Sequence, residues 1–598
     1  MGIFKYISLA ILVIFSGFGT YKLINQKLEK QFIETQIRKD FSTHLKTLDP
    51  INYTSLIGYE PKKELLHLGR MLFNDPILSR NNDVSCATCH LTNHGFADGN
   101  FLSVGSMGIG GPSNLDVGKE WAKGKLSANR ELNASVSGYR TANRMFRNTL
   151  STVNVAYRTK IDNSDGLFND GRFGSLFFQA LMPIHTDLEL CGSNPVPIEG
   201  NIFEQGGPLF HDSVLLTHAN TFDPFQGQEL GEFNAVETTI NGVPTFRPIG
   251  VLSIPGRNEC LAIAIAKIRS VGQYRKLFKE AYDSDEITDQ KIAIALSSFM
   301  LTHVSKNTPY DRFVRGESSL TPSELKGMIS FFTPIGESYK LKDQEIKGGG
   351  CFKCHDAPEF GGHGFANLGV RSDEKSTLTK VTDAVKPGES FFGRNRLQRG
   401  HVPNCHIVGV TATSSFGPDI GRANATFQDS DCFKFRVPPL RNVMETYPYF
   451  HHGSARAQGS LETDYKKRSL LALKQVVKYH LRGPIDTEAY ASNKQSKVFY
   501  DILEQKDYFV PAQTQNFIAL DPNDPQHEKI LDLFPVEMPE EQIDDLVAFI
   551  STGLYDKNTV KVGDLGNDVT HPDHVPSGFS PTITREMGNQ TELPPNRD

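Results

Sequence analysis

The pattern Cys-x-x-Cys-His occurs twice in this 598-residue chain. The first copy is Cys86–His90 ("CATCH") and the second is Cys351–His355 ("CFKCH"). In c-type haem attachment, two thiols bond to the porphyrin and the adjacent histidine becomes an iron ligand. One such pattern is expected by chance only on the order of a few thousandths of a time in this chain. The pattern therefore predicts two haems with His90 and His355 as iron ligands. The attaching thiols are those of Cys86, Cys89, Cys351 and Cys354.

Two other uses of a Cys-x-x-Cys pair are the alternatives. A thioredoxin-like redox pair sits in a βαβ pattern, which surrounds neither copy. A zinc site built from both pairs would leave the histidine after each pair without a role. Haem attachment accounts for all three residue types at both places, so we favour it.

The beginning of the chain predicts export from the cytoplasm. Lys5 precedes a mostly apolar run from Tyr6 to Tyr21, and further lysines follow this run. The run has the length of a signal-peptide core and is short for a membrane span. Because no clear small-x-small cleavage site follows, we favour an uncleaved membrane anchor over a cleaved signal. Both alternatives place the body of the protein in the periplasm or on the periplasmic side of the inner membrane. The formal net charge of -6 argues against nucleic acid as a partner.

Ordered blocks around the two motifs resemble the bacterial di-haem cytochrome c peroxidase family. This family includes the methylamine dehydrogenase maturation enzyme and has rubber oxygenase as a larger relative. The blocks include "LGRMLFNDPILSRNNDVSCATCH", "LFNDGRFGSLFFQALMPIHTDLEL" and "FKFRVPPLRNVMETYPYFHHGS". The likeness covers most of residues 60–185, 260–370 and 420–555. It implies a mainly α fold with two cytochrome c-like haem domains that face each other.

The resemblance also implies a domain organisation. Residues 1–45 form the hydrophobic N-terminal helix, as export signal or membrane anchor, and a linker helix. Residues 46–315 form the N-terminal haem domain with insertions, and residues 316–556 form the C-terminal haem domain. Residues 557–598 are a polar tail, either disordered or wrapped along the surface. Long irregular insertions are expected at 107–145, 191–256, 372–420 and 485–536.

Local patterns favour helices beside both motifs. Leu65, Leu68 and Leu72 repeat with helical spacing before the first motif. Thr321, followed by proline and three positions later by Glu324, predicts a capped helix start. A closing helix is expected to bury Ile543, Leu546, Val547 and Ile550.

The first haem is expected to have an open iron position. In family members that need reductive activation, a histidine in "SIGH" shortly after the first motif is a removable ligand. This chain has Ser103–Ser106 ("SVGS") there, so serine replaces that histidine. Met107 is a neighbouring alternative ligand, and His94 is expected at the surface or beside a haem propionate. The resemblance therefore implies a five-coordinate or water-bound haem that can meet peroxide or dioxygen.

An open haem of this kind needs a group that moves a proton between the oxygens of peroxide. The resemblance places Glu189 at the position of the family's acid/base glutamate, and Gln179 at a glutamine near the same pocket. The alternative is that Glu189 is a surface carboxylate and that Glu199 or His185 does this work.

The second haem is expected to have two histidine ligands. By resemblance, His480 falls on the family position that supplies the ligand opposite His355, and Tyr479 next to it is the alternative. Two histidines would close this haem and lower its potential relative to a His/Met pair. An ordinary helix-face histidine at 480 is the structural alternative.

The segment between the haems departs from the family. Family members usually have "FWDGR", whose tryptophan relays electrons or holes between the haems. This chain has Phe168–Arg172 ("FNDGR"), so Asn169 takes that place, and its single tryptophan, Trp121, lies in an insertion. Electron transfer must then tunnel directly or use another aromatic residue.

Two further features follow from the same comparison and from the compartment. The side chain of Asn148 and the carbonyls of Thr446 and Pro448 match family calcium ligands, and turn chemistry without an ion is the alternative. In an oxidising compartment, the cysteines that bracket two insertions predict two disulfides, although other pairings stay open. The predicted pairs are Cys191–Cys260 and Cys405–Cys432.

The resemblance implies a di-haem peroxidase that reduces hydrogen peroxide with electrons from a small cytochrome, a copper protein or a quinol. One rival is an oxygenase or protein-modifying oxidase on the same scaffold, with the insertions forming a substrate pocket. The other rival is a non-catalytic di-haem electron carrier. A homodimer is compatible with the resemblance, but the sequence does not decide the oligomeric state.

Overall fold

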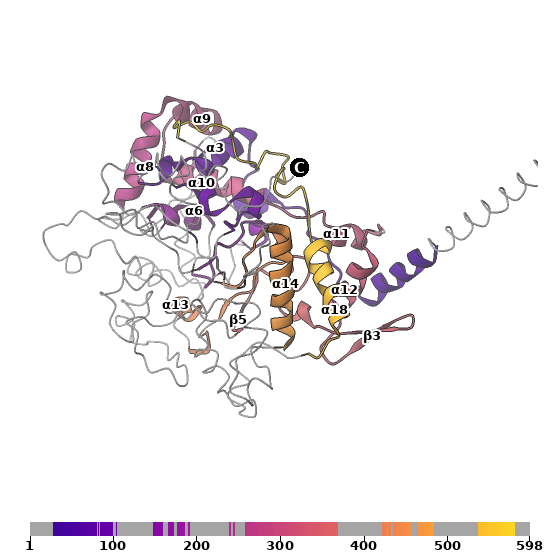
Figure 1. Ribbon diagram of the computed structural model, residues 1–598. Helices are drawn as coiled ribbons and strands as arrows, with labels where there is room; N and C mark the ends of the chain where they lie inside the picture. Colours follow the sequence, from indigo (N-terminus) through magenta and orange to yellow (C-terminus); the bar gives the residue numbers. More distant parts are fainter. Residues whose placement is uncertain are drawn as a thin grey trace, which may run out of the picture.

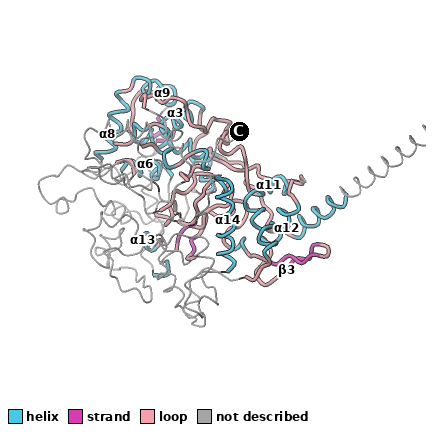
Figure 2. Tube along the Cα trace, in the orientation of Figure 1, coloured by secondary structure: helices cyan, strands magenta, loops and turns pink. Residues whose placement is uncertain are grey.

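The structure is a computed structural model of the chain. The residues that it describes are 28–80, 82, 84–99, 103, 147–158, 166–172, 176–185, 189–191, 238–240, 243–245, 258–317, 319–368, 421–426, 429–431, 434–451, 453, 455, 465–482 and 536–579. Helices predominate among them (Figures 1 and 2), in agreement with the expected mainly α fold.

One group of helices surrounds the first motif and gathers at the upper left of Figure 1. Its members are α2 (Tyr53–Ile57), α3 (Lys63–Asn74), η1 (Pro76–Leu78), α4 (Cys86–Cys89), η2 (Thr92–His94), η3 (Val155–Tyr157), α6 (Leu176–His185), α8 (Asn258–Ser270), α9 (Gly272–Tyr282) and α10 (Asp289–Leu301). Their buried apolar side chains form one continuous cluster, which we call the first core.

The first core depends on the close packing of α3 against α10. The predicted apolar face of α3 is confirmed, because Leu65, Leu68 and Leu72 are all buried. Gly69 lies at the crossing, where an added Cβ would come within 2.1 Å of the carbonyl oxygen of Ala295. Only glycine therefore permits this approach of the two helices.

A second group surrounds the second motif. Its helical members are α11 (Pro309–Val314), α12 (Pro322–Phe332), η4 (Cys351–Lys353), α13 (Ala423–Thr426), η7 (Asp429–Asp431), η8 (Val443–Glu445), α14 (Tyr465–Arg482), α18 (Glu540–Ala548) and the π-helical turn η9 (Phe549–Gly553). Buried apolar side chains of this group, joined by Ile37, Phe41 and Leu45, form a second core.

The expected helix signals of the second group are confirmed. Thr321 and Glu324 form a capping box at the start of α12, with the Thr321 amide donating to Glu324 Oε2 at 2.8 Å. The predicted apolar face of the closing helix is also buried, although α18 ends at Ala548 and Ile550 belongs to η9.

The described strands form antiparallel pairs. β1 (Thr238–Ile240) pairs with β2 (Val243–Thr245), and β3 (Ser338–Leu341) pairs with β4 (Gln344–Lys347). β5 (Phe365–Ala366) pairs with β6 (Phe435–Arg436), so that Phe365 lies opposite Arg436. The last pair brings the segment after the second motif next to the segment that precedes η8.

The first part of the polar tail packs along the first group. Val569 is buried in the first core, and Asp568 forms an ion pair with Arg70 of α3 at 2.7 Å. Ser577 donates to the buried carboxylate of Asp75 at 2.6 Å. Of the two alternatives for the tail, the surface-wrapped one holds for residues 557–579.

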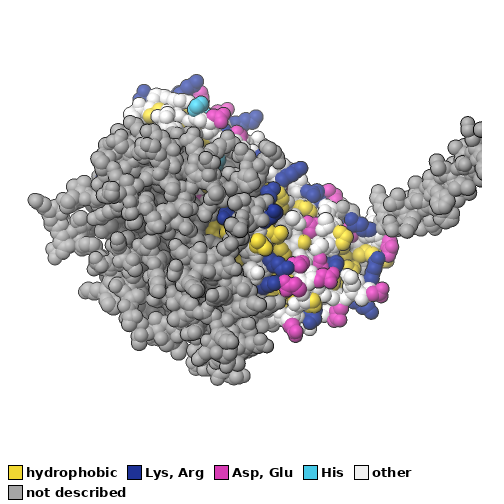
Figure 3. All heavy atoms as spheres, in the orientation of Figure 1, with side chains coloured by type: hydrophobic (Ala, Val, Ile, Leu, Met, Phe, Trp, Pro, Cys, Tyr) yellow, Lys and Arg dark blue, Asp and Glu magenta, His cyan; other side chains and the backbone are white. Residues whose placement is uncertain are grey.

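Tyr310 and Phe313 pack in the second core, although the prediction assigns residues 46–315 to the first haem domain. The domain boundaries stay a prediction. The expected hydrophobic helix of residues 1–27 lies outside the described residues. Within the part of the chain that the structure describes, no helix has the length and hydropathy required to cross a membrane. On the face drawn in Figure 3, acidic and basic side chains are intermixed over the described region.

Candidate haem sites

The first motif is held by a short helix at the edge of the first core. Ser85 and Thr88 cap α4 reciprocally, and the Ser85 amide donates to Thr88 Oγ1 at 2.9 Å. The backbone amide of His90 donates to the carbonyl of Cys86 at 2.9 Å, which sets the histidine directly after the turn that carries both thiols. Cys86 and Cys89 are not disulfide-bonded.

The ring of His90 is oriented by the loop that follows it. His90 Nδ1 lies 2.9 Å from the carbonyl oxygen of Phe96, and burial lowers the pKa of His90. Nδ1 therefore carries the proton, and Nε2 keeps the lone pair that an iron needs. The geometry suits the role that the sequence predicts for His90.

A residue that the sequence did not single out lies next to this loop. His303 is fully buried and stacks on Phe96, with ring centroids 3.8 Å apart. Its Nδ1 lies 2.8 Å from Thr152 Oγ1, and burial, followed by the nearby His90, lowers its pKa well below the usual value. A single histidine after an apolar helix carries no local signal, so only the fold reveals this neighbour of His90.

Glu189 lies close to the first motif. Burial raises the pKa of the Glu189 carboxyl to about 7, and the Arg172 guanidinium opposes this rise. The pKa of the Cys86 thiol is also raised, mainly by burial and in addition by the charge of Glu189. The effect of Glu189 on the Cys86 thiol indicates that this carboxyl lies near the first motif. The acid/base role itself stays a prediction.

The chain around Glu189 is anchored on both sides. The Leu190 amide donates to the carbonyl of Pro183 in α6 at 2.9 Å, and the Arg80 amide donates to the carbonyl of Leu190 at 2.9 Å. Cys191 is disulfide-bonded to Cys260 in α8, which confirms one of the two predicted pairs. Cys405 and Cys432 lie outside the described residues.

Of the other residues predicted for the first haem site, the structure describes Gln179 and the backbone of His185. Gln179 lies on α6, partly buried, one turn before Pro183. Glu199, Met107, Ser106 and Trp121 lie outside the described residues, and the backbone of His185 closes α6. The predicted open iron position therefore stays a prediction.

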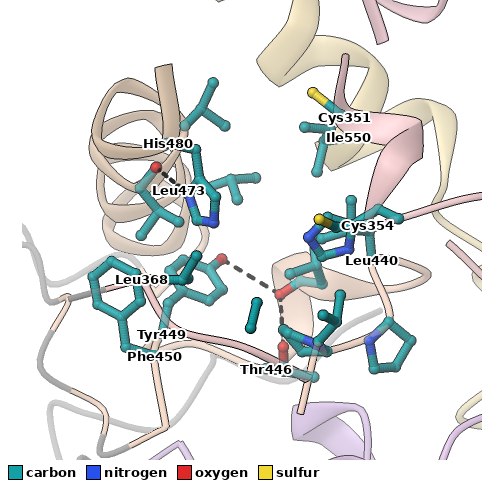
Figure 4. Close-up of a pocket in the computed structure, with 18 of the residues that line it drawn as sticks. Cys351, Cys354, Leu368, Leu440, Thr446, Tyr449, Phe450, Leu473, His480 and Ile550 are labelled. Carbon is teal, nitrogen blue, oxygen red and sulfur yellow. Dashed lines mark hydrogen bonds between the residues drawn. The ribbon is translucent and has the colours of Figure 1, made fainter. Parts of the chain in front are cut away.

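The second motif borders a cavity of about 260 Å³ (Figure 4). Cys351 and Cys354 lie on one side, and His480 projects from α14 on the other. His355 also lines the cavity. The remaining lining is mostly apolar, with Leu473, Val477, Leu546 and Ile550 among it. Two thiols, two imidazoles and an apolar wall are the donor set and surroundings that suit a covalently bound haem.

In both imidazoles at this cavity, Nδ1 is hydrogen-bonded to a backbone carbonyl and Nε2 is left for an iron. His355 Nδ1 lies 3.1 Å from the carbonyl oxygen of Phe360, and His480 Nδ1 lies 2.8 Å from that of Val476. Burial, followed by the proximity of His480, lowers the pKa of His355 to about 4, so the ring is neutral at physiological pH. Nε2 of each ring is the nitrogen left for an iron.

The geometry distinguishes His480 from its neighbour. His480 lines the cavity, whereas the Tyr479 hydroxyl donates to the carbonyl of Leu368 at 2.5 Å. Tyr479 is fully buried, and its ring packs edge-on against Phe450. The contacts favour His480 as the ligand, and this assignment remains a prediction.

Asn169 lies between the two groups, at the position where the family has its tryptophan. It lines the second cavity and is buried, and its carbonyl accepts a hydrogen bond from the Arg436 amide at 2.8 Å. The segment that follows the first motif thus reaches the wall of the second haem site.

Of the two places expected for His94, the surface is wrong, and the place beside a haem propionate stays a prediction. His94 is fully buried, and its Nδ1 lies 2.9 Å from the hydroxyl oxygen of Tyr465 at the start of α14. Tyr465 lies 371 positions further along the chain, so no local pattern could have indicated this contact.

The expected calcium ligands do come together. Asn148, Thr446 and Pro448 all line the second cavity, and Asn148 Nδ2 donates to the carbonyl of Pro448 at 2.6 Å. Asn148 Oδ1 is buried and has no hydrogen-bond partner among the described residues. A cation is one partner that would satisfy this oxygen together with the carbonyls.

The two Cys-x-x-Cys pairs belong to different cores, because Cys86 packs on the first and Cys351 on the second. A shared zinc site is therefore wrong. Among the described residues, no three His, Cys, Asp or Glu side chains lie close enough together to hold a metal ion.

Comparisons with known proteins find a matching family model and several relatives. The family model described as di-haem cytochrome c peroxidase matches residues 63–204 and 242–319. The cytochrome c551 peroxidase of Nitrosomonas europaea is 24% identical over 395 residues, which are 66% of this chain and 70% of the relative.

The chain is also similar to MauG and to a MauG-like protein. The methylamine utilization protein MauG of Methylophilus methylotrophus is 22% identical over 404 residues, which cover 67% of this chain and 72% of the relative. A solved MauG-like protein associated with microbial copper homeostasis is 18% identical, with a TM-score of 0.43, and the similarity covers 86% of this chain and 95% of that one. Together with the two haem motifs, these matches make the chain similar to di-haem cytochrome c peroxidases, with the family model matching residues 63–204 and 242–319.

Proposed function

We propose that this protein is an exported peroxidase that reduces hydrogen peroxide to water with electrons from an external donor. The observation that carries the proposal is the carboxyl of Glu189, which lies near the Cys86 thiol and has a pKa raised by burial to about 7. The proposed donor is a small cytochrome, a copper protein or a quinol. The proposed location is the periplasm or, with residues 1–45 as an anchor, the periplasmic side of the inner membrane.

The residues that would hold the two haems are those of the motifs. Cys86 and Cys89 would attach the first haem, with His90 as its ligand. Cys351 and Cys354 would attach the second haem, with His355 and His480 as its ligands. When bound, each haem supplies an iron that is oxidised and reduced one electron at a time.

Glu189 would move the proton that the reaction requires. As a carboxylate it accepts a proton from one oxygen of hydrogen peroxide, and as a carboxylic acid it returns this proton to the oxygen that leaves as water. A pKa near 7 makes both directions accessible at neutral pH. The amide of Gln179 would hold the peroxide in place by hydrogen bonding.

The substitution Glu189→Gln tests this role, because it keeps the shape and removes the proton transfer. We expect kcat/KM for hydrogen peroxide to fall by about 10²–10⁴-fold, with unchanged haem absorption spectra. Asp289→Asn is the matched control, since burial also raises the pKa of this carboxyl, at the end of α10 remote from His303. Retained turnover in the Glu189 variant would contradict the assignment.

A calcium ion between the two groups is part of the proposal. The side-chain oxygen of Asn148 and the carbonyls of Thr446 and Pro448 would be its protein ligands, with waters completing the shell. Support comes from the buried, unpartnered Oδ1 of Asn148. We expect millimolar calcium to raise the Tm of the chelator-treated holoprotein, and Asn148→Leu to abolish the effect. An equal response to magnesium, or none to calcium, would argue for turn chemistry alone.

A further inference from the structure

A series of aromatic rings connects the loop of the first motif with the wall of the second haem cavity. Ring centroids are 4.8 Å apart for His94 and Tyr465, 5.5 Å for Tyr465 and Tyr447, and 6.1 Å for Tyr447 and Tyr449. Tyr449 lines the second cavity (Figure 4). The three tyrosines are buried. The series begins one loop after His90 and ends beside the second haem site.

The hydroxyl group of Tyr465 has three partners. His94 Nδ1 lies 2.9 Å away, and the carbonyl oxygens of Glu445 and Tyr447 lie 2.9 and 3.2 Å away. A backbone carbonyl accepts a hydrogen bond but does not take a proton at neutral pH. Of these partners, His94 is therefore the one that can accept the phenolic proton, through the lone pair of Nδ1 in its Nε2–H tautomer.

Because Tyr465 is buried, its oxidation requires a base such as His94 to take the phenolic proton. Burial raises the pKa of Tyr465 well above the usual value, so the hydroxyl does not ionise on its own. A buried phenol loses an electron readily only when its proton leaves at the same time, because a charged radical cation is costly in an apolar interior. Tyr465 has the acceptor for that proton within hydrogen-bond distance.

The backbone is shaped around the imidazole of His94. Gly99 has a φ of +70°, and a Cβ added there would lie 2.3 Å from Cε1 of His94. Any other residue at position 99 would displace the ring from Tyr465. The contact between His94 and Tyr465 therefore depends on glycine at position 99 of the loop.

The tryptophan that usually transfers electrons between the haems in the family is missing from this chain. Asn169 stands at the position of the family's tryptophan, and an amide side chain is not oxidised at biological potentials. A second aromatic pair, Phe435 stacked on His451 at 3.6 Å, also borders the cavity. Phenylalanine is much harder to oxidise than tyrosine and has no proton to release, so the tyrosine series is the better relay.

We propose that Tyr465, with His94 as its proton acceptor, relays electrons from the second haem site to the first during peroxide reduction. The inference rests on the function proposed above, in which hydrogen peroxide is the oxidant at the first site. One electron leaves Tyr465 toward the first site while its O–H bond breaks and an N–H bond forms at His94 Nδ1. One electron then tunnels from the second site across Tyr449 and Tyr447, which stay protonated and are not themselves oxidised. The proton returns from His94 Nδ1 and the phenol of Tyr465 is restored.

The test uses the full-length holoprotein with its second haem site reduced, mixed rapidly with hydrogen peroxide. Absorption changes follow oxidation at each site separately, and frozen samples are examined by electron paramagnetic resonance. In Tyr465→Phe we expect oxidation at the first site to be unchanged and oxidation at the second site to slow by at least about tenfold. The matched control is Tyr282→Phe, which also loses one buried hydroxyl bond, at 2.6 Å to the Lys291 carbonyl. This control should behave like the wild type.

Measurements on the wild type test the relay through Tyr465 even if a variant folds poorly. Heavy water should slow oxidation at the second site, and ring-deuterated tyrosine should narrow a radical signal trapped early in the reaction. His94→Gln should slow the same step as Tyr465→Phe, with unchanged haem spectra and reduction potentials. Equal second-site rates in wild type and Tyr465→Phe, or a wild-type step without an isotope effect and without a tyrosyl signal, would overturn the relay. Failure of peroxide to oxidise the first site would instead overturn the proposed function.

Discussion

At the scale of single residues, the two candidate sites differ in what surrounds their titratable groups. At the second site, His355 and His480 are neutral, face the same cavity and have their Nδ1 atoms occupied by carbonyls. At the first site, a carboxyl with a raised pKa lies near the thiol of Cys86. The second site is thus equipped to hold an iron from both sides, and the first to move protons.

The pKa of Glu189 predicts the pH dependence of activity. The carboxylate is the form that accepts a proton from hydrogen peroxide, and burial raises its pKa to about 7. The active form is therefore lost as the pH falls through this value. We expect kcat/KM for peroxide to increase about tenfold from pH 6 to pH 8, and Glu189→Gln to remove this limb of the profile. A flat profile in the wild type would exclude Glu189 as the base.

The ligand of the second haem is tested by a pair of neighbouring substitutions. His480→Gly should convert this haem from low spin to high spin, and added imidazole should restore the low-spin spectrum. Tyr479→Phe should leave the spectrum unchanged, because its hydroxyl is bound to the Leu368 carbonyl. The opposite outcome, with the spectrum altered only in the Tyr479 variant, would assign the ligand to the tyrosine.

At the scale of secondary-structure elements, the turn that carries Glu189 is held in place by contacts with α6 and α8. The turn hydrogen-bonds to Pro183 of α6, and Cys191 ties it to α8 through the disulfide with Cys260. α8 is in turn fixed to the segment before the first motif, since Lys267 donates to Asn82 Oδ1 at 2.7 Å. We expect the disulfide both to stabilise the fold and to position the carboxyl of Glu189.

The double substitution Cys191→Ala with Cys260→Ala separates these two effects. The bond joins residues 69 positions apart, and removing such a link typically costs about 2–5 kcal/mol of stability. We expect a lower Tm and, at temperatures where the variant is still folded, a reduced kcat/KM with unchanged haem spectra. A variant that loses stability but keeps full activity would show that the disulfide does not position Glu189.

At the scale of the whole molecule, two cores are joined by contacts between distant segments. The haem motifs, the helix faces of α3 and α18 and the cap of α12 could be predicted, because each depends on residues a few positions apart. The contact of His94 with Tyr465 and the stacking of His303 on Phe96 could not, because they join segments hundreds of positions apart. Burial of His94 was missed for the same reason, since a histidine in a polar loop has no periodic signal of its own.

The proposed relay through Tyr465 would compensate for the absence of the family's tryptophan. Asn169 is identified by a local motif, whereas the residues of the proposed relay lie in three different segments. A family resemblance can therefore suggest haem-attachment residues, but a path between the sites depends on contacts that only the fold reveals. The rival functions can be distinguished by what binds the first iron: dioxygen in an oxygenase, and a second protein ligand in an electron carrier.

An electron paramagnetic resonance spectrum of the oxidised holoprotein tests the central claim most directly, since it reports the spin state and ligands of each iron. The account predicts one high-spin ferric haem at the His90 site and one low-spin haem with two histidine ligands, His355 and His480. Two low-spin signals, each from an iron with protein ligands on both sides, would contradict it and leave a protein that only carries electrons.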